Sequence, residues 1–202
     1  MSVPTETIRP AKLQDALALA ELVNMAGEGL PFYVWAKMAP PGEDPWQVGR
    51  SRASREEGSF SYRNAWIIEA SDGVAACLVG YPLSDEPEPT NEVALPTMFA
   101  PLQQLENLAP GTWYVNVLAC YPRWRNRGYA SSLLEHAETL ALAAGVSNGM
   151  SVIVADNNVE ARRLYQRFSF REVAQRPMIK EAWDSTGSAW ILLAKDRAAP
   201  AG

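Results

Sequence analysis

The sequence predicts an α/β protein in which helices cover a mixed β-sheet. Apolar runs with the two-residue alternation of strands are interspersed with segments whose apolar residues recur at helical spacing. A strong hairpin signal, Ser71-Asp72-Gly73, separates two β-rich runs. The chain has 202 residues, of which 48% are hydrophobic and 20% charged, so it can bury one full core. We therefore expect one domain over residues 1–202.

The first 83 residues are expected to form a strand, three helices and the hairpin. The first helix is amphipathic and ends at Gly27, and the third has Asp44 as its N-cap and Pro45 in its first turn. In order, the expected elements are a strand at 5–10, helices at 11–27, 30–39 and 44–58, and two hairpin strands at 64–83.

Residues 84–110 are rich in Pro, Glu and Asn, with one helical pattern at 96–108. We interpret this segment as an insertion in the domain, because apolar strands continue on both sides of it. The remaining elements are a strand at 111–120, a helix at 125–145, a strand at 149–156, a helix at 158–168 and strands at 169–180 and 188–196. This order predicts a mixed sheet covered by helices.

Composition restricts the partners and the compartment. A formal net charge of -5 gives no broad attraction to nucleic acid. The first residues lack the apolar core of a signal peptide, and no apolar run reaches the length of a membrane span, so we expect a cytoplasmic protein with no membrane partner. Cys77 and Cys120 lie in apolar strand-like runs and are expected to be buried free thiols. The exposed aromatic residues and the edge of the last strand would suit a homodimer.

A cluster of arginines stands where the longest helix begins. Arg123, Arg125 and Arg127 precede Gly128, between a predicted strand and a predicted helix. A helix N-terminus directs unpaired N–H groups and the positive end of the helix dipole to one point, which suits a phosphate. Gly128 and Ala130 would let such a ligand approach the main chain. The alternative is an ordinary helix start with solvated arginines.

This turn and a later segment together resemble the GNAT superfamily of acyl-CoA-dependent N-acyltransferases. Residues 125–130 match the signature Arg/Gln-x-x-Gly-x-Gly/Ala, and residues 158–170 match the pattern Asn-x-x-Ala-x-x-Leu-Tyr-x-x-x-Gly-Phe. Ser169 stands where that pattern has glycine. The resemblance is specific from about 111 to 173 and looser elsewhere. It implies a GNAT-like fold, in which two parallel strands of the mixed sheet splay apart at their C-terminal ends.

The resemblance also implies acetyl-CoA as the co-substrate, with no metal. The pantetheine arm would pair with the backbone of Leu118 and Cys120, and Asn158 would donate or accept a further hydrogen bond. The pyrophosphate would lie on the amides of Arg125, Asn126, Arg127, Gly128, Tyr129 and Ala130. No cluster of His, Cys, Asp and Glu has metal-ligand spacing, so we expect no metal.

Tyr165 matches the proton donor of this superfamily, although it would also suit a core position on an amphipathic helix. Some relatives carry a glutamate on the central strand, where this chain has no carboxylate, and Asn116 could only order a water. The candidates for a more distant general base are Glu28, Glu69 and Glu92. Alternatively, the acceptor amine has a pKa low enough to need little help.

The segment after the first helix is unusually aromatic. Phe32, Tyr33, Trp35 and Trp46 either pack a helical cap onto the sheet or line an acceptor pocket in which Glu28 holds a cationic amine. His136, the only histidine, lies well inside the long helix and is expected to have a packing or surface role.

These observations favour an acetyl-CoA-dependent N-acetyltransferase that transfers an acetyl or short acyl group to a primary amine of a small molecule or peptide by direct attack. The main alternative is a domain that binds acyl-CoA without turnover. A dinucleotide-binding domain is disfavoured, because its glycine-rich turn would follow the first strand of the fold.

Overall fold

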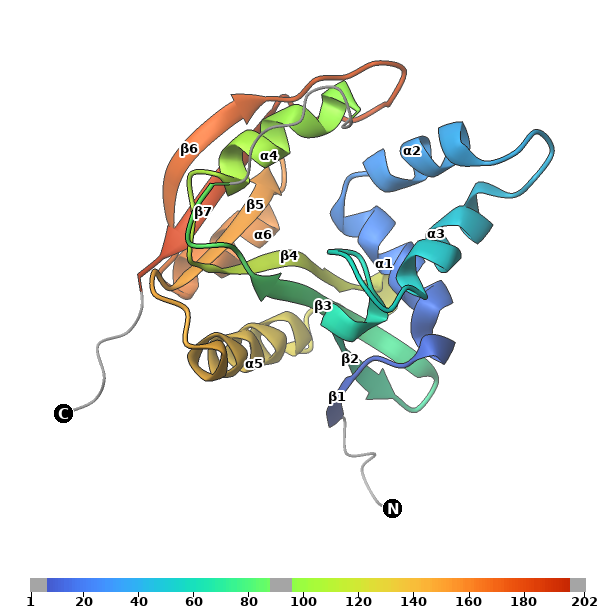
Figure 1. Cartoon of the computed structure of the whole chain (residues 1–202). Coiled ribbons are helices and arrows are strands. Elements are labelled where there is room, and N and C mark those ends of the chain that lie inside the picture. Colours follow the sequence, from blue (N-terminus) through green and yellow to red (C-terminus); the bar gives the residue numbers. More distant parts are fainter. Residues whose placement is uncertain (1–6, 88–95, 197–202) are drawn as a thin grey trace. The chain divides into compact units, whose positions relative to one another are not determined.

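The computed structural model describes residues 7–87 and 96–196 (Figure 1). In this part of the chain the strands form one seven-stranded mixed sheet with the order β1-β2-β3-β4-β5-β7-β6, which confirms the predicted fold class. The strands are β1 (Thr7–Pro10), β2 (Ala65–Ala70), β3 (Gly73–Pro82), β4 (Trp113–Cys120), β5 (Met150–Ala155), β6 (Arg171–Pro177) and β7 (Ala189–Lys195).

The helices follow the predicted order, with shifts at their ends. They are α1 (Ala16–Ala26), α2 (Leu30–Met38), α3 (Pro45–Ala53), α4 (Ala100–Glu106), α5 (Tyr129–Ala144) and α6 (Val159–Arg167), with 3-10 turns η1 (Leu13–Asp15), η2 (Tyr62–Asn64), η3 (Thr97–Phe99) and η4 (Pro122–Trp124). As predicted, Asp44 caps α3 by accepting a hydrogen bond from the N–H of Trp46 at 3.0 Å. The predicted extension of α3 to residue 58 is wrong, because Ser61 Oγ bonds the carbonyl of Arg55 and holds this segment as a loop.

Two compact units make up the chain: residues 1–80 with 116–137, and residues 81–115 with 138–202. In the first unit, β1 pairs antiparallel with β2, and β2 with β3 in the predicted hairpin. Leu19 and Leu22 of α1 pack with Ile67, Cys77 and Val117 of the strands in one apolar cluster. On α5, His136 contacts Trp66 of β2 edge-on, with 5.9 Å between the ring centroids, in agreement with the expected packing role.

In the second unit, β4 pairs in parallel with β5 over Trp113–Val115, and β7 pairs antiparallel with both β5 and β6. The free edge expected at the last strand is therefore wrong, because β6 covers that side of β7. The register of β6 shifts between Glu172 and Ala174, which leaves Val173 54% exposed. The predicted insertion contributes η3 and α4 to this unit, where α4 contacts β5, β6 and β7.

Two further sequence predictions concern the cysteines and membranes. Cys77 is fully buried, as predicted, but Cys120 is only half-buried, because it lies near the end of β4. Within residues 7–87 and 96–196, no helix is both long and apolar enough to cross a membrane.

Candidate functional site

The segment between β4 and α5 leaves its backbone open to solvent. Asn126 and Gly128 have φ angles of 60° and 84°, in the left-handed region that an α-helix cannot include, so α5 starts only at Tyr129. A side-chain carbon placed on Gly128 would meet nothing within 4 Å. Residues 125–128 are exposed. Open space therefore lies beside Gly128 where a 16-residue helix begins, and the N-terminus of a helix is a site that suits phosphate groups.

The three arginines of this turn have different partners. Arg125 Nε donates a hydrogen bond to the carbonyl of Cys120 at 3.4 Å. Arg127 lies over the ring of Trp124, 4.7 Å from its centroid, and Arg123 lies 5.7 Å from the same ring. Trp124 itself is only 8% exposed, and its ring lies 6.2 Å from that of Tyr129. A buried indole thus holds cationic side chains beside the open turn.

Trp124 was not among the residues predicted from the sequence. A tryptophan between arginines is a usable signal for a cation–π contact, but only the fold shows that its ring is buried while the arginines stay exposed.

The C-terminal end of β4 pairs with β3 along one edge only. Tyr121 N–H donates to the carbonyl of Ala75 on β3 at 3.0 Å. Since backbone groups alternate between the two edges of a strand, those of Leu118 and Cys120 point to the opposite edge. The side chains of Asn116, Leu118 and Cys120 likewise share one face, away from the cluster that contains Val117.

Helix α6 is closed at both ends by specific contacts. Asn158 Oδ1 accepts the N–H of Ala161 at 3.2 Å, so this side chain is the N-cap of α6. At the other end, Phe170 N–H donates to the carbonyl of Tyr165 and Ser169 N–H to that of Gln166, both at 3.0 Å. This is a Schellman motif, which needs a left-handed residue after the helix, and Ser169 takes that conformation with φ 66°.

Tyr165 is a buried phenol on this helix. It is 4% exposed, and its ring packs against Phe170 with 5.5 Å between the centroids. Burial raises its pKa well above the usual value of about 10. The side chain is therefore neutral across the physiological range.

A profile of the acetyltransferase (GNAT) family matches residues 31–170, which is more than half of the chain. This chain belongs to the acetyltransferase (GNAT) family. The match contains the turn at Gly128, the strand β4 and the helix α6.

Solved GNAT structures share this fold along nearly the whole chain. An N-acetyltransferase from Staphylococcus aureus Mu50 is 22% identical, with a TM-score of 0.61 over 93% of this chain and 98% of that one. A Drosophila melanogaster polyamine N-acetyltransferase is 16% identical, with a TM-score of 0.62 over 94% and 99%. The ribosomal-protein-S18-alanine N-acetyltransferase from Escherichia coli is 16% identical, with a TM-score of 0.59 over 98% and 97%. At these identities the likeness is one of fold, and no curated protein sequence matches this chain.

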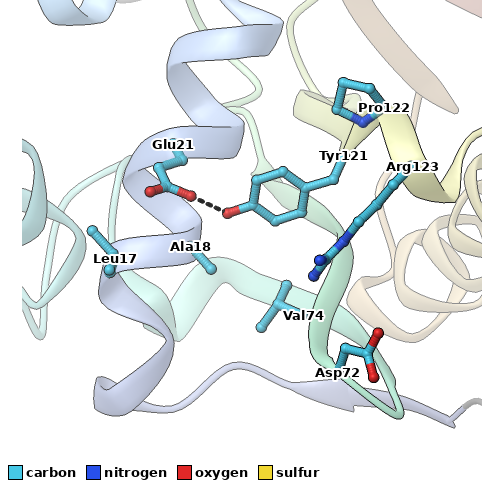
Figure 2. Close-up of a pocket in the computed structure, with 8 residues that line it drawn as sticks. All are labelled: Leu17, Ala18, Glu21, Asp72, Val74, Tyr121, Pro122 and Arg123. Atoms are coloured by element: carbon cyan, nitrogen blue, oxygen red, sulfur yellow. Dashed lines mark hydrogen bonds between the residues drawn. The ribbon is translucent and has the colours of Figure 1, made fainter.

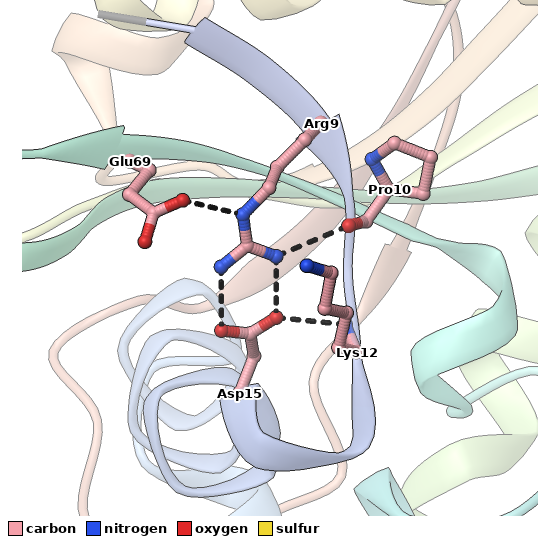
Figure 3. Close-up of polar contacts among 5 residues, drawn as sticks. All are labelled: Arg9, Pro10, Lys12, Asp15 and Glu69. Atoms are coloured by element: carbon pink, nitrogen blue, oxygen red, sulfur yellow. Dashed lines mark hydrogen bonds and ion pairs between the residues drawn. The ribbon is translucent and has the colours of Figure 1, made fainter.

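The general-base candidates of this GNAT chain differ in their surroundings. Burial raises the pKa of Glu28, whose backbone is left-handed with φ 55° between α1 and α2. The opposite holds for Glu69: Arg9 Nε donates to its carboxylate at 2.6 Å and lowers its pKa, which makes Glu69 a weaker base (Figure 3). Glu92 lies outside the described residues. The local environment therefore favours Glu28.

The contact between Arg9 and Glu69 belongs to a structural network. Two nitrogens of Arg9 bond the two carboxylate oxygens of Asp15 at 2.8 and 3.0 Å, and the N–H of Lys12 donates to Asp15 at 2.7 Å (Figure 3). These bonds join β1, β2 and the start of α1. Burial of Asp15 opposes its ionisation, but the hydrogen bonds from Arg9 and Lys12 outweigh this and lower its pKa.

The aromatic segment after α1 packs α2 against α3. Trp35 is 3% exposed, and its ring lies 5.8 Å from Trp46 and 6.2 Å from Phe60. A side-chain carbon on Gly49 of α3 would stand 2.6 Å from the Trp35 ring. Phe32 contacts the other side of this group, with its ring 4.9 Å from Trp46. Of the two readings of this segment, these contacts favour helix packing for Trp35, Trp46 and Phe32, whereas Tyr33 lies instead beside Lys37, whose Nζ is 4.7 Å from its ring.

Proposed function

We propose that this chain transfers an acetyl or other short acyl group from coenzyme A to a primary amine of a small molecule or peptide, by direct attack of the amine. The observation that carries the proposal is the open, glycine-bearing turn at the N-terminus of α5, flanked by arginines. The family membership of the chain supports the transferase chemistry. The acceptor classes named for the solved relatives, a polyamine and an alanine of a ribosomal protein, are both amines.

The residues of the turn fit the diphosphate of coenzyme A. The amides of residues 125–130 would bind its oxygens, and the empty space at Gly128 would admit them close to the main chain. Arg125 and Arg127 would balance the negative charge. The backbone of Leu118 and Cys120 would pair with the pantetheine amides, and Asn158, whose Oδ1 already caps α6, would contact this arm through its amide nitrogen.

When bound, acetyl-CoA supplies the thioester whose acyl group is transferred. In our proposal Tyr165, which is protonated at neutral pH, gives its proton to the departing thiolate. The backbone at Leu118 and Cys120 provides N–H donors that can polarise the thioester carbonyl. Glu28 is the proposed route for the proton of the amine, directly or through water ordered by Asn116.

Calorimetric titration with acetyl-CoA and with desulfo-CoA tests the binding step without knowledge of the acceptor. We expect micromolar binding that Gly128→Trp abolishes. Gly145→Trp is a matched control, because Gly145 lies at the other end of α5 with φ 68° and an equally open environment. Both variants carry the same backbone strain, but only one fills the turn.

An equal loss of acetyl-CoA affinity in both variants, or an unchanged affinity in Gly128→Trp, would contradict the assignment of the turn as the diphosphate site. With binding established, thiol release is measured over a panel of small amines and peptides. Binding of acetyl-CoA without thiol release for any amine would favour the alternative, a domain that binds acyl-CoA without turnover.

A further inference from the structure

A second hollow of the first unit lies on the side of α1 and uses none of the residues assigned above to coenzyme A (Figure 2). Its volume is about 550 Å³, within the range of sites for small organic ligands. Three parts of the chain line it: α1, the turn between β2 and β3, and the segment that follows β4. The lining residues are Leu17, Ala18, Glu21, Asp72, Val74, Tyr121, Pro122 and Arg123.

The floor of this hollow is apolar and continuous with the core. Val74 and Tyr121 pack against the apolar cluster under α1 and also face the hollow. Leu17, one turn before Glu21 on α1, leaves 45% of its surface exposed there. An apolar ligand group that covered Leu17, Val74 and the Tyr121 ring would remove this surface from water.

The charged groups of the hollow stand on different walls. The hydroxyl of Tyr121 donates a hydrogen bond to Glu21 Oε2, which orients this carboxylate from the α1 side. From the opposite side, Arg123 extends below the Tyr121 ring toward Val74 in Figure 2. Arg123 lines this hollow, and its guanidinium also lies 5.7 Å from the centroid of the Trp124 ring.

Asp72 is the third charged group and lies at the rim. It is exposed in the hairpin turn, where Ser71 Oγ donates to it at 3.2 Å. An exposed, solvated carboxylate contributes little to binding. The two charges beside the apolar floor are therefore the carboxylate of Glu21 and the guanidinium of Arg123, with opposite signs.

We propose that this hollow is a binding site for a free amino acid with an apolar side chain. The α-ammonium group would pair with Glu21, the α-carboxylate with Arg123, and the side chain would lie on Leu17, Val74 and Tyr121. One ligand of this class satisfies both charges and covers the apolar floor. A simple amine or a simple carboxylate would form an ion pair with only one of the two groups.

Three probes of one shape test the charge pattern: L-phenylalanine, phenethylamine, which lacks the carboxylate, and 3-phenylpropionate, which lacks the ammonium group. Binding to the whole chain is measured by two-dimensional NMR titration without coenzyme A. We expect L-phenylalanine to bind at least about tenfold more tightly than either analogue, the size of one lost charge-assisted hydrogen bond. An affinity of phenethylamine or 3-phenylpropionate equal to that of the amino acid would overturn the proposal.

Two variants test which group of the ligand each charged residue binds. Glu21→Gln should lower the affinity for L-phenylalanine about tenfold and leave the affinity for 3-phenylpropionate unchanged. Arg123→Gln should lower the affinity for L-phenylalanine and leave the affinity for phenethylamine unchanged. Glu57→Gln is the control, because Glu57 is an exposed glutamate that does not line the hollow. Thermal denaturation shows that each variant is folded. If a variant lowered the affinity for all three probes equally, or if Glu57→Gln also lowered the affinity for L-phenylalanine, the site would lie elsewhere.

Discussion

The guanidinium of Arg127 lies 4.7 Å from the ring centroid of Trp124, beside the open turn that begins α5. A side chain as long as arginine loses much conformational freedom when it binds a ligand. The indole reduces this loss, because it holds Arg127 near the turn before a ligand arrives. Trp124 would therefore act as a positioning residue for the proposed coenzyme site.

Replacement of Trp124 by leucine should lower the affinity for acetyl-CoA about fivefold, which corresponds to the loss of an exposed cation–π contact. Trp124→Phe should retain most of the affinity, because a smaller aromatic face remains. In an Arg127→Gln background, the leucine substitution should have little further effect. Calorimetry of the four proteins of this cycle measures the coupling, and additive losses would show that Trp124 only supports the local fold.

Tyr165→Phe should slow acyl transfer by roughly 10²-fold while leaving the dissociation constant of acetyl-CoA unchanged, as expected for a lost general acid. Because burial raises the pKa of Tyr165, the wild-type rate should not decline from deprotonation of this group below about pH 10. Tyr114→Phe provides a control, since Tyr114 is a buried tyrosine of the same unit, 3% exposed. Pre-steady-state rates over pH would contradict the role if both variants behaved alike.

Asp15→Asn should lower the free energy of unfolding by about 3 kcal/mol at pH 7, because it leaves Arg9 without its bidentate partner. The folded-state pKa of Asp15 lies below its unfolded value of about 3.9, so ionised Asp15 stabilises the fold above that pH. This stabilisation is lost as the pH falls through the folded-state pKa. Urea denaturation should therefore show a difference from wild type that shrinks toward pH 2.

Glu69→Gln gives the comparison for that experiment. Glu69 bonds the same arginine, but its side chain is 53% exposed, so its removal should cost much less than that of Asp15. A loss as large as that of Asp15→Asn would mean that Arg9 is anchored mainly on β2.

Ser169→Gly should stabilise the protein by about 0.5–1 kcal/mol, because glycine adopts the left-handed conformation required after α6 without the strain of a side chain. Ser169→Ala keeps that strain and should bring no gain. Thermal unfolding of the two variants separates backbone strain from the loss of the hydroxyl. A stabilised alanine variant would show that the hydroxyl itself is unfavourable.

Local chemistry made much of this protein predictable. The hairpin at Gly73, the cap at Asp44 and the glycine of the α5 turn depend on the conformations that single residues accept, and each was predicted where the structure has it. The end of α3 was not predicted correctly, since it depends on the hydrogen bond from Ser61 to the carbonyl of Arg55, six residues earlier in the chain.

The order of strands and helices, the turn at Gly128 and the family were all predictable, because they follow from periodicity and from short motifs. Which charged side chains meet was not predictable before the fold was known. Glu21 and Tyr121 are 100 residues apart and Arg9 and Glu69 are 60 apart, and spacing along the chain carries no information about either pair. The physical reason is that such contacts depend on strand register and helix packing, which bring side chains together independently of their distance in sequence.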